Sequence, residues 1–252
     1  MFRLRPAVLT VPAPSQFGRD VNVLRYANDA ALGGRLGIGN RLELTLLLNA
    51  GLYQRGAGIK GVTDQSASGV TTTTRHDPRL GFGYALGSRT PRWGAKLRFE
   101  AKLPLGDAEA LSGEPSFVAS PSLALSSELG GFFAGAELGA RLRRPTSVFG
   151  VRIGSQASIA VGAGYQLRRA GIALAAELYA LPSLIDSGSA RYLPSEWLAT
   201  LSFAPRSLER VAFGLGGGGG LPLSSEKGGS SLAFGVPSFR GLAFVRLAPP
   251  VD

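Results

Sequence analysis

His76 is the only histidine of the chain, and Asp77 follows it directly. A histidine beside a carboxylate can act as a general base in a hydrolytic reaction. The pair follows a stretch rich in Gly, Ser and Thr at 64–74, so we expect it near the tip or descending limb of a long loop. Spacing identifies no serine or further carboxylate that would complete a catalytic set. A solvated loop histidine is the favoured interpretation, and we expect that the protein is not an enzyme.

The chain has few residues of the types that bind metals or cofactors. The chain has no cysteine and one methionine, Met1, so it forms neither a disulfide nor a thiolate metal site. The run GLGGGGG at 214–220 contains G-x-G-x-x-G, but a dinucleotide site needs a strand before this motif and a helix after it. The run leads into Leu221-Pro222-Leu223 with no helical pattern. We therefore predict no bound metal and no cofactor. The glycine run is predicted to be a strand in a close-packed or strongly bent part of the sheet.

The charged residues are the remaining candidates for a functional role. The formal net charge is +10, although only 17% of the residues are charged. The basic residues are spread along the chain and alternate with apolar ones. This distribution differs from the compact basic run of a nucleic-acid-binding arm, so we expect no nucleic-acid partner.

The elements that would position these charges have a period of two residues. From 93 to 103 the odd positions are apolar, and the even positions are glycine or charged. A strand separates such a pattern onto two faces, whereas a helix would spread the charges around its circumference. The same split recurs in about twelve segments, near 2–11, 23–38, 41–53, 78–87, 93–104, 116–128, 132–144, 153–167, 171–181, 196–204, 211–221 and 238–247. The chain is therefore predicted to be all-β and antiparallel.

The connections between these segments alternate strictly between short and long. Short turns are expected at 39–40, 87–92, 130–131, 168–171 and 205–210, and longer linkers near 12–22, 54–77, 105–115, 145–152, 182–195 and 222–237. Transmembrane β-barrels combine tight periplasmic turns with longer extracellular loops. We predict one domain over 1–252, a transmembrane up-and-down β-barrel of about twelve strands with both termini on the periplasmic side.

A soluble β-sandwich also alternates apolar and polar residues, so it is the main alternative fold. Three features favour the barrel. Many segments have ten or more residues, whereas globular strands usually have five or six. Aromatic residues lie near segment ends, at Tyr53, Trp93, Phe132, Trp197 and Phe203, as in an interfacial girdle. The polar faces are rich in Gly, Ala and Ser, which suits a confined lumen. These features predict the bacterial outer membrane, with its lipid, lipopolysaccharide and barrel-assembly machinery as partners.

Three stretches carry a resemblance to a known family. They read NRLELTLLLNAGLYQRG, RWGAKLRFEAKLPLGD and GVPSFRGLAFVRLAPPVD, and they resemble the N-terminal barrel of myxobacterial-type OmpA-family proteins. In that family an acidic calcium-binding-type linker and a peptidoglycan-binding domain follow the barrel. The resemblance implies a fragment that lacks this domain, through which a longer parent would bind peptidoglycan. Residues 1–6 also lack the features of a signal peptide, so we expect a mature form, an excised domain or a mis-assigned start.

In a barrel the charged side chains of the strands face the lumen. By parity these are Arg35, Arg41, Glu43, Arg79, Lys96, Arg98, Glu100, Lys102, Glu137, Arg141, Arg143, Glu177, Arg240 and Arg246. They either line an aqueous path that favours anions or pair with one another and plug the lumen.

A narrow or partly plugged pore is the favoured interpretation. We predict an OmpA-like structural envelope component with passive, anion-leaning passage of small solutes. The alternatives are a dedicated transporter for small or hydrophobic compounds, against which the charged lumen argues, and an outer-membrane hydrolase that uses His76.

Overall fold

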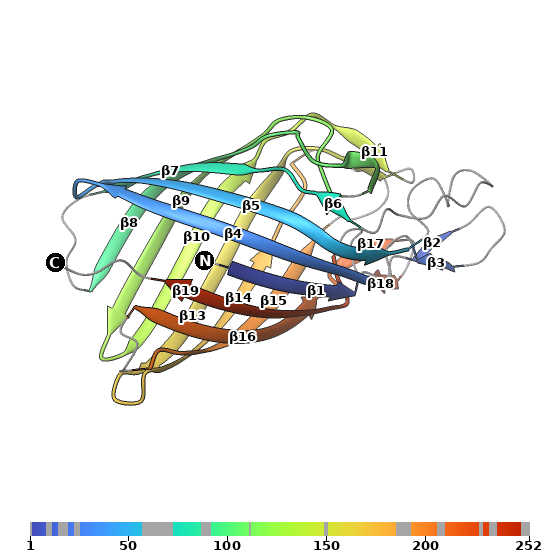
Figure 1. The fold of residues 1–252 in the computed structure, drawn as a ribbon. Coiled ribbons are helices and arrows are strands. Elements are labelled where there is room, and N and C mark those ends of the chain that lie inside the picture. Colours follow the sequence, from blue (N-terminus) through green and yellow to red (C-terminus); the bar gives the residue numbers. More distant parts are fainter. Residues whose placement is uncertain are drawn as a thin grey trace.

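The computed structural model describes residues 2–8, 12–14, 20–22, 26–56, 73–86, 92–110, 112–148, 151–184, 193–205, 210–226, 229–231 and 236–247. Twelve strands of seven or more residues dominate this part of the chain (Figure 1). They are β1 (Phe2–Val8), β4 (Tyr26–Ile38), β5 (Leu42–Arg55), β7 (Arg79–Leu86), β8 (Trp93–Lys102), β9 (Val118–Leu129), β10 (Phe132–Arg141), β13 (Gln156–Leu167), β14 (Ile172–Ala180), β15 (Ser195–Phe203), β16 (Val211–Gly220) and β19 (Phe239–Leu247).

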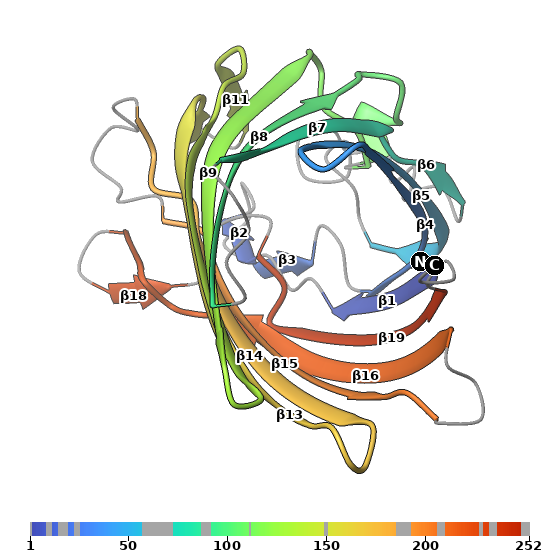
Figure 2. The same cartoon turned by 90° about the vertical axis from the view of Figure 1, so that its left-hand side faces the viewer.

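The strands pair antiparallel with their neighbours in sequence, and the pairing runs all the way round. Strand β4 pairs with both β1 and β5, and β1 pairs in turn with β19, the last strand. Figure 2 looks along the axis and shows the strands arranged as a ring. Such a ring has no unpaired edge, and lipid offers no hydrogen bonds to satisfy one. The predicted antiparallel up-and-down barrel of twelve strands is confirmed.

Short turns and long connections lie at opposite ends of the barrel. The turns at 39–41, 130–131 and 168–171 join strands directly, and Gly39, Gly130, Gly131 and Gly171 there have φ values of 58°, 60°, 95° and 67°. Tight hairpin turns require such positive φ values. The predicted turns at 87–92 and 205–210 fall mainly outside the described residues. Strand β1 begins and β19 ends at the short-turn end (Figure 1), which is therefore the periplasmic end.

The long connections contain elements that the period-two pattern does not predict. They are the hairpins β2 (Pro12–Pro14)/β3 (Asp20–Asn22), β11 (Thr146–Val148)/β12 (Val151–Ile153) and β17 (Ser224–Glu226)/β18 (Gly229–Ser231), the two-residue strand β6 (Thr74–Arg75) and a 3-10 turn, η1 (Ala108–Ala110). The segment predicted as a strand over 132–144 also ends earlier, at Arg141. There the Arg143 amide donates to the Ser155 hydroxyl instead of continuing the ladder.

The outward face of the barrel is an exposed apolar belt. Leu32, Leu138 and Leu215 are about 60% exposed, with relative areas of 57%, 62% and 64%. A water-soluble protein rarely exposes apolar side chains over so wide an area, whereas acyl chains would cover them. Exposed aromatic residues gather near both rims: Trp93, Phe132, Tyr165 and Phe203 at the periplasmic end, and Tyr53, Trp197 and Phe239 at the loop end. This arrangement is the double aromatic girdle of outer-membrane barrels.

No helix in the described ranges has the length and apolar character to span a membrane.

The inward face of the wall from β13 to β16 is rich in small residues. Its members include Ala160, Gly162, Gly164, Ala173, Ala175, Gly214, Gly216 and Gly218. The glycine-rich run forms strand β16, as predicted, and no helix follows it. Gly214 has to be glycine because a Cβ there would lie 2.2 Å from the ring of Phe244 on β19. The rings of Phe133 and Phe244 lie against Gly164 and Gly214, whereas Ala160, Gly162 and Ala175 border open space inside the barrel.

Candidate functional site: the charged interior of the barrel

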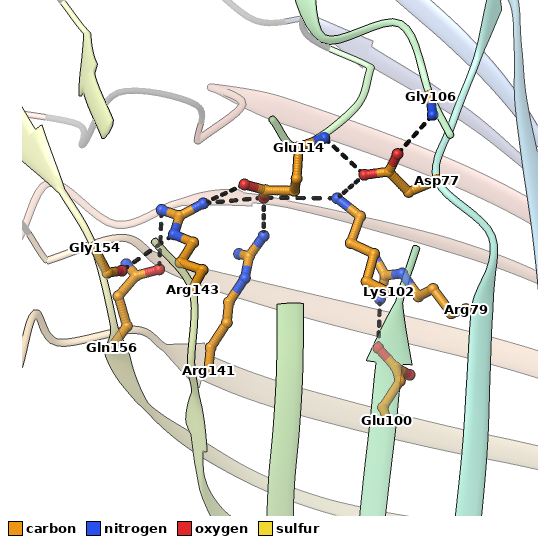
Figure 3. Close-up of polar contacts among 10 residues, drawn as sticks. All are labelled: Asp77, Arg79, Glu100, Lys102, Gly106, Glu114, Arg141, Arg143, Gly154 and Gln156. Carbon is orange, nitrogen blue, oxygen red and sulfur yellow. Dashed lines mark hydrogen bonds and ion pairs between the residues drawn. The ribbon is translucent and has the colours of Figure 1, made fainter. Parts of the chain in front are cut away.

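Seven charged side chains lie together near the loop end and form what we call the outer cluster: a connected network of five, with the separate ion pair Arg79–Glu100 beside it (Figure 3). Its members are Asp77, Arg79, Glu100, Lys102, Glu114, Arg141 and Arg143. Strands β7, β8 and β10 present Arg79, Lys102 and Arg141 on their inward faces, because each of these residues has the parity that points away from lipid. Arg143 lies two residues beyond the end of β10. Of the three acidic residues, Glu100 lies on β8, and Asp77 and Glu114 come from the connections outside the strands.

Asp77 anchors the connection between β8 and β9 to the barrel wall. Its carboxylate is fully buried and accepts hydrogen bonds from the backbone N–H groups of Gly106 and Glu114, both at 2.7 Å. The Nζ atom of Lys102 lies 3.2 Å from the same carboxylate. A buried carboxylate needs partners of this kind, because water is not available to solvate it. Two backbone N–H groups of this connection, those of Gly106 and Glu114, are therefore bonded to Asp77.

Glu114 is the centre of the outer cluster. Its carboxylate accepts hydrogen bonds from the guanidinium groups of Arg141 and Arg143, the latter at 2.8 and 3.0 Å, and Lys102 Nζ lies 3.6 Å away. Only 12% of the Glu114 side chain is exposed. Burial raises the pKa of this carboxyl, but Arg141, Arg143 and Lys102 lower it more strongly, and the result is a pKa below 4.5. Glu114 is therefore ionised at neutral pH.

Arg143 is held by more than its acidic partner. Its Nε atom donates to the Gly154 carbonyl at 3.1 Å, and one Nη donates to Gln156 Oε1 at 3.4 Å. Gln156 is buried in turn, and its amide donates to the Leu181 carbonyl at 3.2 Å. Through these contacts the loop-side ends of β10, β13 and β14 are joined to the connection that carries Glu114 (Figure 3).

A second network, the inner cluster, lies closer to the periplasmic end. Glu43 on β5 lies 2.9 Å from Lys96 Nζ and 3.4 Å from Arg35 Nε. Beside it, Arg98 on β8 pairs with Glu137 on β10 at 2.5 Å. Across the lumen, Arg240 on β19 pairs with Glu196 on β15 at 3.0 Å. The inner cluster therefore links β4, β5, β8 and β10, and a separate pair bridges the opposite wall.

A cavity of about 860 Å³ occupies the interior beside these clusters. Lys96, Arg98 and Glu137 line one side of it, and the small residues of β13 and β14 line the other. Glu177 also lines the cavity and forms no ion pair with any residue that the structure describes. The interior is therefore polar and charged but is not completely filled by its side chains.

The His76–Asp77 neighbours do not act as a pair. His76 Nε2 lies 3.3 Å from Asp29 Oδ1 on β4 without forming a hydrogen bond. The Asp77 carboxylate contacts Lys102 and accepts from two backbone amides instead. The described part of the chain contains no group of three His, Asp or Glu side chains that could hold a metal ion. The arrangement of His76 offers no hydrolytic set, and the absence of enzyme activity stays a prediction.

The structure brings most of the sequence-predicted lumen residues into the two clusters. Four of them lie outside both clusters. Glu177 lines the cavity and Arg240 pairs with Glu196 on the opposite wall. Arg41 is in the turn at 39–41, where it donates to the Tyr84 hydroxyl at 3.2 Å, and Arg246 is exposed near the end of β19. Arg143 lies beyond β10 but still reaches Glu114. The role of the predicted set as a pore lining or a plug stays a prediction.

Parity did not identify the acidic residues Asp77 and Glu114, because they lie in connections where a period of two has no meaning. Glu196 lay on the polar face of its predicted strand but was not included in the lumen set.

These acidic residues change the charge balance of the interior. Among the described residues, the clusters and their neighbours hold as many acidic as basic side chains: Asp29, Glu43, Asp77, Glu100, Glu114, Glu137, Glu177 and Glu196 against Arg35, Arg79, Lys96, Arg98, Lys102, Arg141, Arg143 and Arg240. The basic excess of the whole chain is therefore not found among these residues of the clusters and their neighbours.

Comparison with known proteins agrees with this geometry at the level of the fold. No family model matches the chain, and no curated protein matches it in sequence. Among solved structures, the NanC porin superposes with a TM-score of 0.64 at 10% identity, covering 99% of this chain and 100% of that one. An outer-membrane channel from Pseudomonas putida F1 superposes with a TM-score of 0.67 at 18% identity, covering 98% and 93%.

The fold and the charged interior thus define an outer-membrane β-barrel. Its apolar belt and aromatic girdles fit the chain to that membrane, which is where it resides. The matches support outer-membrane barrels in general and give no support to the OmpA family in particular.

Proposed function

We propose that this protein is a passive channel for small hydrophilic solutes across the outer membrane. The observation that carries the proposal is the cavity of about 860 Å³ between the charge clusters and the small-residue wall. A fully plugged barrel would place large or paired side chains on all of its inward faces. Here Ala160, Gly162 and Ala175 line this cavity where bulky residues would close it.

The pairing of the interior charges favours neutral and zwitterionic polar solutes. Each cluster offers hydrogen-bond donors and acceptors, but its acidic and basic groups largely neutralise one another. An interior of this kind gives a passing ion little reason to prefer one sign of charge. The anion preference predicted from the basic excess therefore gains no support from the described interior. The polar lining also argues against a dedicated route for hydrophobic compounds.

The two similar structures are described as a porin and a channel, which is consistent with passage of solutes. They do not identify a substrate for this protein. A purely structural envelope component, as the OmpA-like resemblance implied, is the rival function. Lipid, lipopolysaccharide, the assembly machinery and, through a longer parent, peptidoglycan remain the expected partners.

Liposome swelling separates the two functions. Liposomes that contain the full chain should swell in iso-osmotic sugar, faster for monosaccharides than for trisaccharides, because the paired clusters narrow the path. Aromatic solutes should give no advantage over sugars of similar size. Swelling no faster than in protein-free liposomes would contradict the channel and favour the structural role. Faster entry of aromatic solutes would favour the hydrophobic transporter.

A further inference from the structure

Exposed arginines gather at the periplasmic end of the barrel. Arg41, Arg92, Arg168, Arg169, Arg210 and Arg246 all lie in the short turns or within two residues of a strand end there, and all are exposed. The acidic residue described among them is Glu128, at the end of β9. Glu43 lies slightly further inside, where Arg35 and Lys96 already neutralise it. The described part of this end is therefore strongly basic, in contrast to the balanced interior.

Three of these residues, which we call the rim arginines, stand at the mouth of the lumen. Arg92 lines the interior cavity together with Glu128. Arg168 pairs with Glu128, and both side chains are at least half exposed. Arg246 shares the inward face of β19 with Arg240 and the buried Leu242. Arg41 differs from them, because its bond to Tyr84 holds it toward the outward face.

We propose that the rim arginines Arg92, Arg168 and Arg246 set an anion preference for the channel at its periplasmic mouth. The inference rests on the proposed channel function and adds the ligand class that the mouth attracts: small solutes that carry a carboxylate, phosphate or sulfate group. Rings of arginine favour anions in pores, and a charged opening with low-dielectric walls raises the local concentration of counter-ions. Among the described residues of this end, Glu128 neutralises one of the three arginines, which leaves a net positive charge on this part of the mouth.

The electrostatic origin of the anion preference predicts how that preference depends on salt concentration. The rim arginines are exposed, so their field is screened over the Debye length, about 10 Å at 0.1 M and about 3 Å at 1 M. At 0.1 M the field extends across much of the opening, whereas at 1 M it reaches little beyond each side chain. A preference produced by the buried clusters would change far less, because buried charges are screened less.

Reversal potentials of the full chain in bilayers of neutral lipid test the inference. Under a KCl gradient at low ionic strength, the wild-type permeability ratio of Cl⁻ over K⁺ should exceed one. The combined substitution Arg92→Gln, Arg168→Gln and Arg246→Gln should bring the ratio to about one without loss of conductance in 1 M KCl. Arg55→Gln with Arg144→Gln removes two exposed arginines at the loop end and should leave the ratio unchanged.

A second measurement needs no variant: the wild-type ratio should fall toward one when the mean KCl concentration is raised to 1 M. A conducting channel with no preference, with cation preference, or with a ratio that the rim substitutions do not change would overturn the inference and leave the channel standing. An absence of both conductance and liposome swelling would overturn the channel and the inference together.

Discussion

Removing the negative charge of Glu114 should weaken the whole loop end of the barrel. The substitution Glu114→Gln keeps the size and shape of the side chain but leaves Arg141, Arg143 and Lys102 around a neutral amide. Asp77 is then the nearest acidic partner that remains, and it contacts only Lys102 among these three. The two guanidinium groups lose their charged acceptor in a site where their side chains are 25% and 10% exposed.

The expected size of the effect follows from this burial. Removing one partner of a buried, hydrogen-bonded ion pair costs about 3–5 kcal/mol, mostly because the other charge stays buried without compensation. Arg143 keeps its bonds to Gly154 and Gln156, and the glutamine carbonyl can still accept one hydrogen bond. We therefore expect the lower end, a loss of about 3 kcal/mol in the free energy of unfolding.

Urea unfolding of the protein in lipid vesicles measures this loss, with the fluorescence of the two tryptophans as the readout. The matched control is Glu128→Gln, which removes an acidic partner of Arg168 at an exposed site, with side chains 50% and 66% exposed. Exposed pairs contribute about 1 kcal/mol or less. If Glu114→Gln destabilises the barrel no more than Glu128→Gln, the outer cluster does not anchor the connection and the reasoning fails.

Three further outcomes are expected. First, Glu114 has a folded pKa below its unfolded value, so its ion pairs contribute fully above about pH 4.5 and are lost as the pH falls through the folded pKa. The wild-type urea midpoint should therefore drop on acidification below pH 4.5, and that of Glu114→Gln should drop less; equal drops would exclude Glu114 as the titrating group. Second, Ala175→Trp places a bulky side chain on the small-residue wall and should lower single-channel conductance several-fold, whereas Ala176→Trp on the outward face should not; equal conductances would mean that the path does not follow this wall. Third, Leu125→Arg on the lipid face should cost about 2–4 kcal/mol of stability, against a small cost for Ala124→Arg on the inward face, and a reversed order in urea unfolding would contradict the assigned faces.

The fold could be predicted almost completely because its determinants are local. Along β8 the alternation of Lys96, Arg98 and Glu100 with apolar residues defines a strand and its two faces without any knowledge of its neighbours. Glycines in the short turns and the alternation of connection lengths then give the order of the strands. The hairpins inside the long connections were missed, because they are too short to show a period of two.

The partners of the interior charges could not be predicted. Lys96 meets Glu43 although 53 residues separate them, and this contact depends on the register and curvature of the closed sheet. Glu114 lies in an irregular connection whose position is set by tertiary contacts to Asp77 rather than by any repeating pattern. For the same reason the sequence could relate His76 only to its neighbour Asp77 and favoured a solvated loop position, whereas the fold brings it to Asp29.

The most direct test of the membrane barrel with an aqueous interior is site-directed spin labelling along β8. The chain contains no cysteine, so single cysteines can be introduced at each position from 94 to 101 without a background label. In lipid vesicles, labels at 95, 97, 99 and 101 should collide mainly with lipid-soluble oxygen, and labels at 94, 96, 98 and 100 with a water-soluble nickel chelate. Apolar positions that neither reagent reaches would indicate a sandwich core, and they would contradict both the barrel and its lumen.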